Sequence, residues 1–187
     1  MNPDQELVEA VLARKPGAFE RLVATHQGLC WHIILRLVRH PEDARDLCQE
    51  AFLRVHQFLH QFRYDCALKS WIGRVAYMVA LRHLEKQRIP VVSADADDDG
   101  DLLASHSDGF DLESALVDHE LAGHLHAAID ALPPVQRTIL TLYHLEELSI
   151  PDIAQVTGMA VGTIKSHLFR TRLQLRQWLE NRLGVMA

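Results

Sequence analysis

An acidic stretch of thirty residues divides this chain into two parts. Residues 91–120 contain ten Asp and Glu and no Lys or Arg. The flanks are mildly basic: residues 1–90 hold 13 Lys and Arg against 10 Asp and Glu, and residues 121–187 hold 6 against 5. The first half of the stretch is rich in Asp, Ser, Ala and Gly without helical periodicity, which is typical of a flexible linker. We therefore predict two small domains, at 1–90 and 113–187, joined by an acidic linker at 91–112.

Helical periodicity runs through both flanking parts, and strand-type alternation persists nowhere in the chain. One helix is expected to open at Pro41, because proline fits the first turn and Glu42 and Asp43 follow it near the positive end of the helix dipole. Its apolar residues recur every four positions and predict a buried stripe made of Leu47, Ala51, Val55 and Leu59. We therefore predict an all-α protein with two small helical domains.

The cysteines, the apolar runs and the histidines bear on the cellular compartment, on membrane insertion and on metal binding. There are three cysteines, an odd number, and no CxxC pair, which is typical of free thiols in the cytoplasm. No apolar run approaches the roughly 20 residues of a membrane helix, and the N-terminus has no basic and apolar leader. His56 and His60 are four apart and Cys66 follows, but no third ligand lies at a fixed short spacing. We expect a cytoplasmic protein with no membrane insertion, no metal site and no cofactor.

On the helix expected to open at Pro41, the face opposite the apolar stripe is polar and mostly acidic. It carries Asp43, Asp46, Gln49 and Glu50. Such a strip suits either a solvated surface or a docking surface for a basic partner helix. Spacing alone favours the solvated surface.

The helix expected from Trp71 to about Lys86, together with the loop before it, interleaves basic and aromatic residues. This mixture suits single-stranded nucleic acid, because rings stack on exposed bases while cations follow the phosphates. The candidate residues are Arg63, Tyr64, Lys69, Trp71, Arg74, Tyr77 and Arg82. The alternative is that Trp71 and Tyr77 pack into a small helical core. Packing is favoured for Trp71, which is flanked by Ile72 and Val75, whereas exposure is favoured for the loop residues.

The segment SIPDIAQVTGMAVGTIKSHLFR has the pattern of a helix-turn-helix. Ser149, with Asp152 three residues on, resembles a capping box. Gly158 supplies the turn, where left-handed backbone costs other residues about 1 kcal/mol or more. In the helix that follows, Thr163, Ser166 and His167 can reach base edges, and the phosphate anchors are Lys165, Arg170 and Arg172. The alternative is a helical hairpin with solvated Lys and Arg, which leaves the combination of cap and glycine turn unexplained.

Three segments, taken in order, match one pattern: PEDARDLCQEAFLRVHQFLHQFR, LKSWIGRVAYMVALRHLEKQR and LPPVQRTILTLYHLEELSIPDIAQVTGMAVGTIKSHLFRTRLQLR. Together they make the chain resemble a bacterial RNA polymerase sigma factor of the extracytoplasmic-function (ECF) type, over essentially its full length. The first resembles the core-binding segment of sigma domain 2, the second its promoter-melting and −10 recognition helix, and the third domain 4, which reads the −35 element. The order and spacing of all three make the resemblance specific.

The resemblance implies a role for each surface. The residues that would dock on the clamp helices of core RNA polymerase are Asp43, Asp46, Leu47, Gln49, Glu50 and Phe52. The basic and aromatic residues would capture unpaired −10 bases, and domain 4 would sit on the polymerase flap while its last helix reads −35 promoter DNA. No residue would be catalytic. The resemblance also implies an inhibitory anti-sigma factor and a stress, envelope or metal-response regulon.

The sequence departs from the family pattern at positions that would meet DNA. Tyr77-Met78 stands where the family often has Arg-Asn, and Arg82 stands where it commonly has Asp. His167 stands where Arg is frequent, and a mostly neutral imidazole makes a weaker phosphate or guanine contact than a bidentate Arg. Ala160 replaces a common Pro at the start of the reading helix.

Two other functions fit parts of the sequence. One is an operator-binding helix-turn-helix regulator whose N-terminal helices sense a ligand or a metal. The other is a helical interaction protein with no DNA role. The acidic strip and the basic-aromatic helix favour the sigma factor over the regulator.

Overall fold

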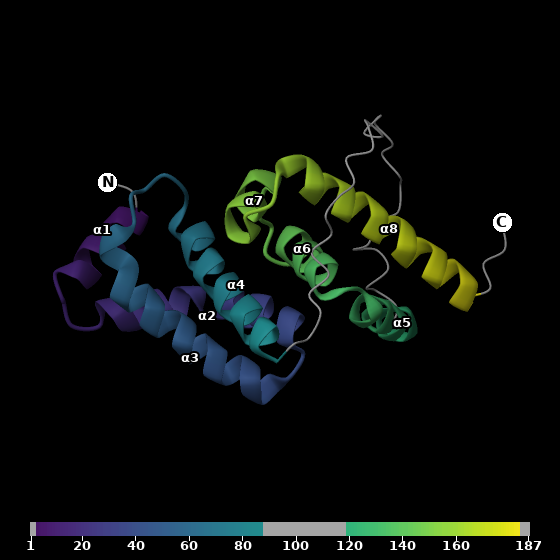
Figure 1. Cartoon of the computed structure of the whole chain (residues 1–187), viewed down its shortest axis with the longest axis horizontal. Helices are drawn as coiled ribbons and strands as arrows, with labels where there is room; N and C mark the ends of the chain where they lie inside the picture. The colour runs from purple at the N-terminus through teal and green to yellow at the C-terminus, as the bar shows by residue number, and fades with distance from the viewer. Residues whose placement is uncertain (1–2, 88–118, 184–187) are drawn as a thin grey trace.

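The computed structural model of the protein describes residues 3–87 and 119–183, and every regular element in those ranges is a helix (Figure 1). The N-terminal part contains α1 (Pro3–Leu12), α2 (Ala18–Val38), α3 (Pro41–Phe58), the short 3-10 helix η1 (Leu59–Gln61) and α4 (Leu68–Lys86). The C-terminal part contains α5 (His119–Ala131), α6 (Pro134–His144), α7 (Ile150–Thr157) and α8 (Val161–Leu183). The all-α prediction is confirmed for these ranges. The predicted linker at 91–112 lies outside the described residues.

Helix α2 is the central element of the N-terminal part, and α1, α3 and α4 all contact it. Its side chains Leu22, Ile33 and Ile34 are fully buried. The apolar stripe predicted for the next helix is also buried, three residues on α3 and one on η1: Leu47, Ala51, Val55 and Leu59. Burying a large aliphatic side chain stabilises a fold by about 1.5–3 kcal/mol. This packing therefore holds the helices of the N-terminal part together.

A two-residue turn joins α2 to α3. Arg39 has left-handed backbone (φ 65°), and its N–H donates to the carbonyl of Leu35 at 2.9 Å, which closes the end of α2. Nδ1 of His40 accepts from the N–H of Asp43 at 3.5 Å, and Pro41 occupies the first turn of α3. The chain therefore reverses at once, and α3 runs back along α2.

The helix-turn-helix expected in the C-terminal part is formed by α7 and α8. The Ser149 hydroxyl accepts from the N–H of Asp152 at 3.2 Å, which caps α7 as predicted. Gly158 ends α7 in left-handed backbone (φ 78°), and its N–H donates to the carbonyl of Ala154 at 2.8 Å. Helix α8 then begins at Val161. Both local predictions, the cap and the glycine turn, are confirmed.

The two parts pack against each other, which the sequence did not predict. Helix α6 contacts α2, and α7 contacts α4 (Figure 1). The buried residues that α6, α7, α8 and the turn before α7 add to the core of the N-terminal part are Val135, Ile139, Leu142, Leu148, Ile153, Val156, Ile164 and Leu168. A separate small cluster within the C-terminal part joins Ala128, Leu132, Leu140 and Leu175. The domains predicted from the sequence therefore share one apolar interior.

We expect Ser149→Ala to lower the free energy of unfolding by about 1 kcal/mol, because it removes the acceptor that satisfies the Asp152 N–H at the start of α7. Urea unfolding followed by circular dichroism measures the change. Ser166→Ala, in the middle of α8, is the matched control and should not destabilise the protein, since alanine is the better helix former. Equal destabilisation by both changes would contradict the role of the cap.

Candidate nucleic-acid interface

The first half of α8 presents cations to solvent. Lys165, Arg170 and Arg172 are exposed, and Thr163 and Ser166 are half-buried beside them. The guanidinium of Arg170 donates to the carbonyl of Ser166 at 3.4 Å. That of Arg172 lies 5.3 Å from the ring centre of Tyr143 on α6, a cation–π contact. These five predicted DNA-contact residues of α8 are therefore exposed or half-buried.

The sixth candidate on α8, His167, lies elsewhere. Its side chain is only 2% exposed, and among the described residues neither ring nitrogen has a hydrogen-bond partner. Thr171, one turn further on, is buried too, and its hydroxyl lies 3.5 Å from Oε1 of Gln136, so this face of α8 points to α6. Burial, and then the nearby Arg170, lower the pKa of His167 and favour the neutral ring. The expectation that His167 reaches a base edge is therefore corrected: it is an interior residue.

Aromatic rings cluster where the loop after η1 leads into α4. The ring of Phe62 lies 4.8 Å from that of Tyr64 and 5.6 Å from that of Trp71. Tyr64 is 47% exposed, in left-handed backbone (φ 62°), and Arg63 beside it is exposed as well. Trp71 is half-buried against the core. The loop thus offers one exposed ring and one exposed cation for nucleic acid.

Tyr77, by contrast, belongs to the core of the N-terminal part. Its side chain is 2% exposed, and burial raises the pKa of its hydroxyl to about 12. The sequence left the role of Tyr77 open between stacking on DNA and packing in the core, and in the structure its side chain packs in the core. Arg82, one turn and a residue further along α4, is exposed. The predicted basic-aromatic set is therefore not one continuous surface.

Two further predicted DNA contacts, Lys69 and Arg74, are engaged by the C-terminal part. The ammonium of Lys69 donates to the backbone carbonyl of Glu146 at 2.9 Å and lies 3.3 Å from its carboxylate. The guanidinium of Arg74 donates to the carbonyl of Gln155 at 3.1 Å. Between them, the hydroxyl of Ser70 donates to Oδ1 of Asp152 at 3.1 Å. These pairs are 77 to 82 residues apart in sequence, so no local pattern announces them.

The polar strip of α3 is exposed at its centre and paired at its ends. Asp46 and Gln49 are exposed. Asp43 lies 3.5 Å from Nδ1 of His40 and 3.7 Å from Nε2 of His83, while Glu50 pairs with Arg54 at 2.7 Å. Leu47 and Phe52, the apolar members of the predicted docking set, are 6% and 8% exposed. The predicted docking set therefore combines exposed hydrogen-bond acceptors, Asp46 and Gln49, with the nearly buried side chains of Leu47 and Phe52.

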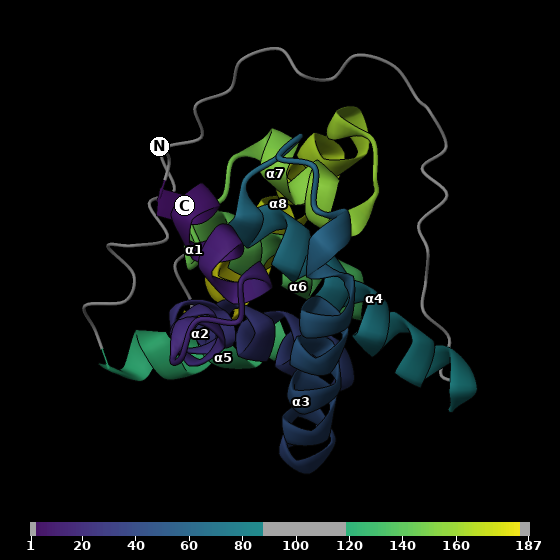
Figure 2. The same cartoon turned by 90° about the vertical axis from the view of Figure 1, so that its left-hand side faces the viewer.

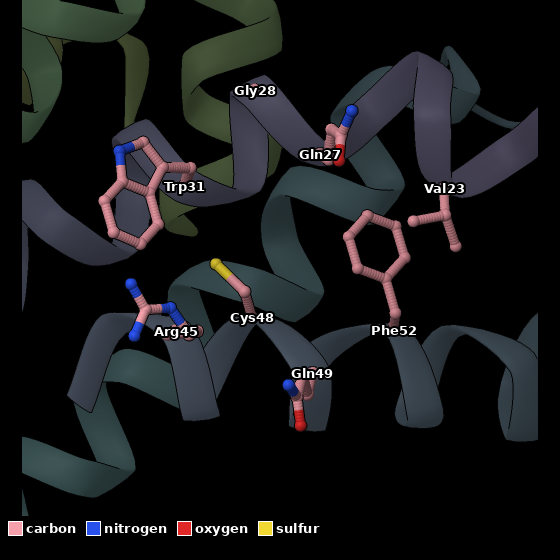
Figure 3. Close-up of a pocket in the computed structure, with 8 residues that line it drawn as sticks. All are labelled: Val23, Gln27, Gly28, Trp31, Arg45, Cys48, Gln49 and Phe52. Carbon is pink, nitrogen blue, oxygen red and sulfur yellow. The ribbon is translucent and has the colours of Figure 1, made fainter. Parts of the chain in front are cut away.

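A groove of about 520 Å³ runs between α2 and α3 beside this strip (Figure 3). Trp31 faces Arg45 and Cys48 across it, and Phe52 points toward Val23. The complete lining is Val23, Gln27, Gly28, Trp31, Arg45, Cys48, Gln49 and Phe52. Burial raises the pKa of the Cys48 thiol to about 11, so it is protonated and adds to an apolar wall. The docking residues predicted from the sequence include two that line this groove, Gln49 and Phe52, and none from α2.

The histidine pair that suggested a metal does not form a ligand set. His56 packs edge-on against Phe19, with ring centres 4.9 Å apart. Within residues 3–87 and 119–183 no three His, Cys, Asp or Glu side chains come together as a metal site would require. In the same ranges no helix has the length and apolar content to cross a membrane.

Comparison with known proteins gives two family matches and several relatives. The chain matches the families described as "Sigma-70 region 2" over residues 22–89 and "Sigma-70, region 4" over residues 123–175. It is 36% identical over 173 residues to the RNA polymerase sigma-H factor of Pseudomonas aeruginosa, with 90% of each chain covered. It is 32% identical over 176 residues to the ECF RNA polymerase sigma-E factor of Escherichia coli K12, again with 90% of each chain covered.

Two solved structures have a similar fold. One is CnrH in complex with the cytosolic domain of CnrY, with a TM-score of 0.67 and 20% identity over 96% of this chain and 99% of that chain. The other is the sigma factor RpoE in complex with the anti-sigma factor NepR from Bartonella quintana, with a TM-score of 0.63 and 20% identity over 88% and 98%. At this identity the likeness supports the helical fold alone.

The buried ring of His167 predicts a pH dependence of stability. Its lowered pKa means that the unfolded chain binds a proton near pH 6.5 that the folded protein takes up only at lower pH. The free energy of unfolding should therefore fall as the pH drops from 7 to 5, by up to about 1.4 kcal/mol per pH unit from this group. His167→Gln should show a shallower fall over the same range. Parallel pH profiles for the two proteins would contradict the burial.

Proposed function

The chain belongs to the ECF group of the sigma-70 family, and from this premise we propose that it docks on core RNA polymerase through the α2–α3 groove and reads promoters with both of its domains. As a sigma factor it directs transcription initiation and is not an enzyme, because the chemistry of RNA synthesis belongs to the polymerase. Membership of this family sets aside the operator-binding regulator. The place of action is the cytoplasm, where the polymerase works.

The observation that carries the proposal is the groove itself. Its lining combines the apolar side chains of Phe52 and Trp31 with the polar Gln49, and Asp46 is exposed elsewhere on α3. Helices of a partner bind such a groove with an apolar stripe, and basic residues beside the stripe can pair with carboxylates outside the groove, such as Asp46. The clamp helices of the polymerase are the proposed occupant. The proposed docking residues are Asp43, Asp46, Leu47, Gln49, Glu50 and Phe52.

For the −10 element we propose capture of unpaired bases at the loop before α4 and along that helix. Tyr64 and Arg63 are exposed, so they are available for stacking and for phosphate contact. Trp71 presents part of its ring next to them. Lys69, Arg74 and Arg82 supply further cations, of which Lys69 is paired with Glu146 and Arg74 with the carbonyl of Gln155 in the structure. Tyr77 contributes by packing beneath α4 and not by touching DNA.

For the −35 element we propose that α8 enters the major groove. Thr163 and Ser166 face base edges, while Lys165, Arg170 and Arg172 anchor the phosphates. These three cations can neutralise only a few phosphates, and salt weakens such a contact steeply. Free DNA binding is therefore weak, and affinity comes from linking two weak modules on one polymerase.

We further propose that an anti-sigma factor holds the protein silent and that the regulon answers stress, envelope damage or metals. The support is indirect. CnrH and RpoE, which share its fold, were solved in complexes with the cytosolic domain of CnrY and with the anti-sigma factor NepR. Co-purification from cells under non-inducing conditions, followed by mass spectrometry of the bound proteins, tests the presence of such an inhibitor.

Asp46→Arg should abolish binding to core polymerase in a pull-down, because it places a cation where basic clamp residues are expected. Asp46 is exposed, so the fold should persist, which a thermal melt checks. Glu9→Arg, the same charge change at an exposed site on α1, should bind core normally. Unchanged recovery of polymerase by Asp46→Arg would count against the docking groove.

Arg170→Ala should weaken a −35-dependent promoter by about tenfold, which corresponds to about 1.4 kcal/mol and to one lost contact with a base or a phosphate. Core binding through the groove should stay unchanged, because Arg170 does not line it. Reconstituted transcription with promoters that differ only in the −35 element measures the effect. Arg21→Ala, an exposed arginine on α2, is the control. An equal loss of transcription on a promoter that lacks the −35 element would contradict the assignment of Arg170 to −35 recognition.

A further inference from the structure

The end of α6 contacts the side chain of Arg172, which projects from α8. The two helices lie side by side (Figures 1 and 2). The guanidinium carbon of Arg172 lies 5.3 Å from the ring centre of Tyr143, within the range of a cation–π contact. Nη2 of the same guanidinium lies 3.4 Å from Nε2 of His144, the last residue of α6. The rings of Tyr143 and His144 meet edge to face, with centres 5.0 Å apart. Two neighbouring rings of one helix therefore contact one arginine of the next.

The contact between Arg172 and His144 requires a neutral imidazole. A guanidinium only donates hydrogen bonds, so Nε2 of His144 accepts and the ring proton resides on Nδ1. Burial, and then the nearby Arg172, lower the pKa of His144 and favour this neutral form. His144 is therefore an acceptor for the guanidinium and not a second cation that repels it.

The other cations assigned to the phosphates have different surroundings. The guanidinium of Arg170 donates to the carbonyl of Ser166, one turn back on the same helix, at 3.4 Å. The side chain of Lys165 is exposed. Within residues 3–87 and 119–183, Arg172 is thus the one of these three cations that side chains of another helix hold.

A guanidinium held in this way still has donors for DNA. It carries five N–H donors in one plane, and the bond to His144 uses one of them. An arginine that moves freely loses rotamer freedom when it binds a phosphate, whereas a side chain that is already held loses less. Tyr143 is itself half-buried against the core, so it is a fixed support for the guanidinium.

We propose that Tyr143 and His144 are positioning residues for −35 recognition, which hold the guanidinium of Arg172 ready to anchor a phosphate before DNA arrives. The role of Arg172 at DNA rests on the proposed function, whereas the contact among the three side chains does not. The two rings act through Arg172 and not by touching DNA. They reduce the conformational freedom that is lost on binding, so α8 binds more tightly with the same number of cations.

A double-mutant cycle on holoenzyme, reconstituted from core polymerase and the full chain, tests the proposal. The probe is a labelled duplex of one promoter at which the unaltered holoenzyme starts transcription, and fluorescence anisotropy measures its affinity. Tyr143→Leu keeps an apolar side chain against the core but removes the ring. It should weaken binding by about threefold to tenfold, the gain expected from one side chain held in advance. Tyr143→Phe keeps the ring and should bind as the unaltered protein does.

Two arginine backgrounds separate positioning from a general disturbance of the domain. In an Arg172→Ala background, Tyr143→Leu should have no further effect, because its target is gone. In an Arg170→Ala background the effect should persist in full, because Arg170 bonds the carbonyl of its own helix. An equal effect of Tyr143→Leu in both backgrounds would overturn the proposal, and so would unaltered affinity of Tyr143→Leu in the otherwise native chain.

A measurement without DNA tests the contact independently of the proposed function. In the free protein with isotope-labelled arginine, the Nε signal of Arg172 is identified by its loss in Arg172→Lys. Its heteronuclear Overhauser effect should be close to that of the ordered backbone and should fall in Tyr143→Leu and in His144→Leu. His144→Gln, which keeps an acceptor, should retain most of it.

The two measurements fail in different ways. An Arg172 side chain as mobile in the unaltered protein as in Tyr143→Leu would overturn the proposed positioning, whatever the DNA affinities are. A side chain that is ordered as expected, together with unaltered promoter affinity of Arg172→Ala, would instead contradict the proposed function of Arg172 at the −35 element.

Discussion

The close approach of α7 to α4 at Gly73 is the constraint on which the arrangement of this protein depends. Because Gly73 has no side chain, Val156 reaches the interior formed by α2 and α4, and one apolar core spans both domains. The same approach brings Glu146 to Lys69 and Asp152 to Ser70. A Cβ at this position would stand 3.1 Å from Cγ2 of Val156, so a side chain there would force Val156 to shift. The packing at Gly73 thus lies next to the polar pairs that join the two domains.

Charge is distributed so that each surface suits a different partner. The chain is acidic overall, with a net charge of −6, yet the first half of α8 presents only cations and the strip on α3 mostly acids. An acidic strip on a helix suits a basic partner, and a cationic helix face suits a phosphate backbone. Neither surface is large or strongly charged. In the proposed function, promoter recognition therefore depends on both domains being carried by one polymerase.

Local features were predictable from the sequence, and long-range burial was not. The cap at Ser149, the turn at Gly158 and the buried stripe of α3 follow from rules that involve residues within one or two turns. His167 was expected to reach a base edge, and Tyr77 was a candidate for stacking on DNA with core packing as the alternative. Each is 2% exposed, because a distant helix covers it, and helical spacing carries no information about that helix. The α2 wall of the groove was missed for the same reason.

Reconstituted transcription tests the central claim most directly. Purified protein is added to sigma-free core RNA polymerase with fragmented genomic DNA as template, and the 5′ ends of the transcripts are sequenced. The account predicts discrete start sites that share a −35 and a −10 element and that disappear with Asp46→Arg. Start sites no different from those of core polymerase alone would contradict it. So would tight binding of the protein, as a dimer and without polymerase, to a palindromic operator.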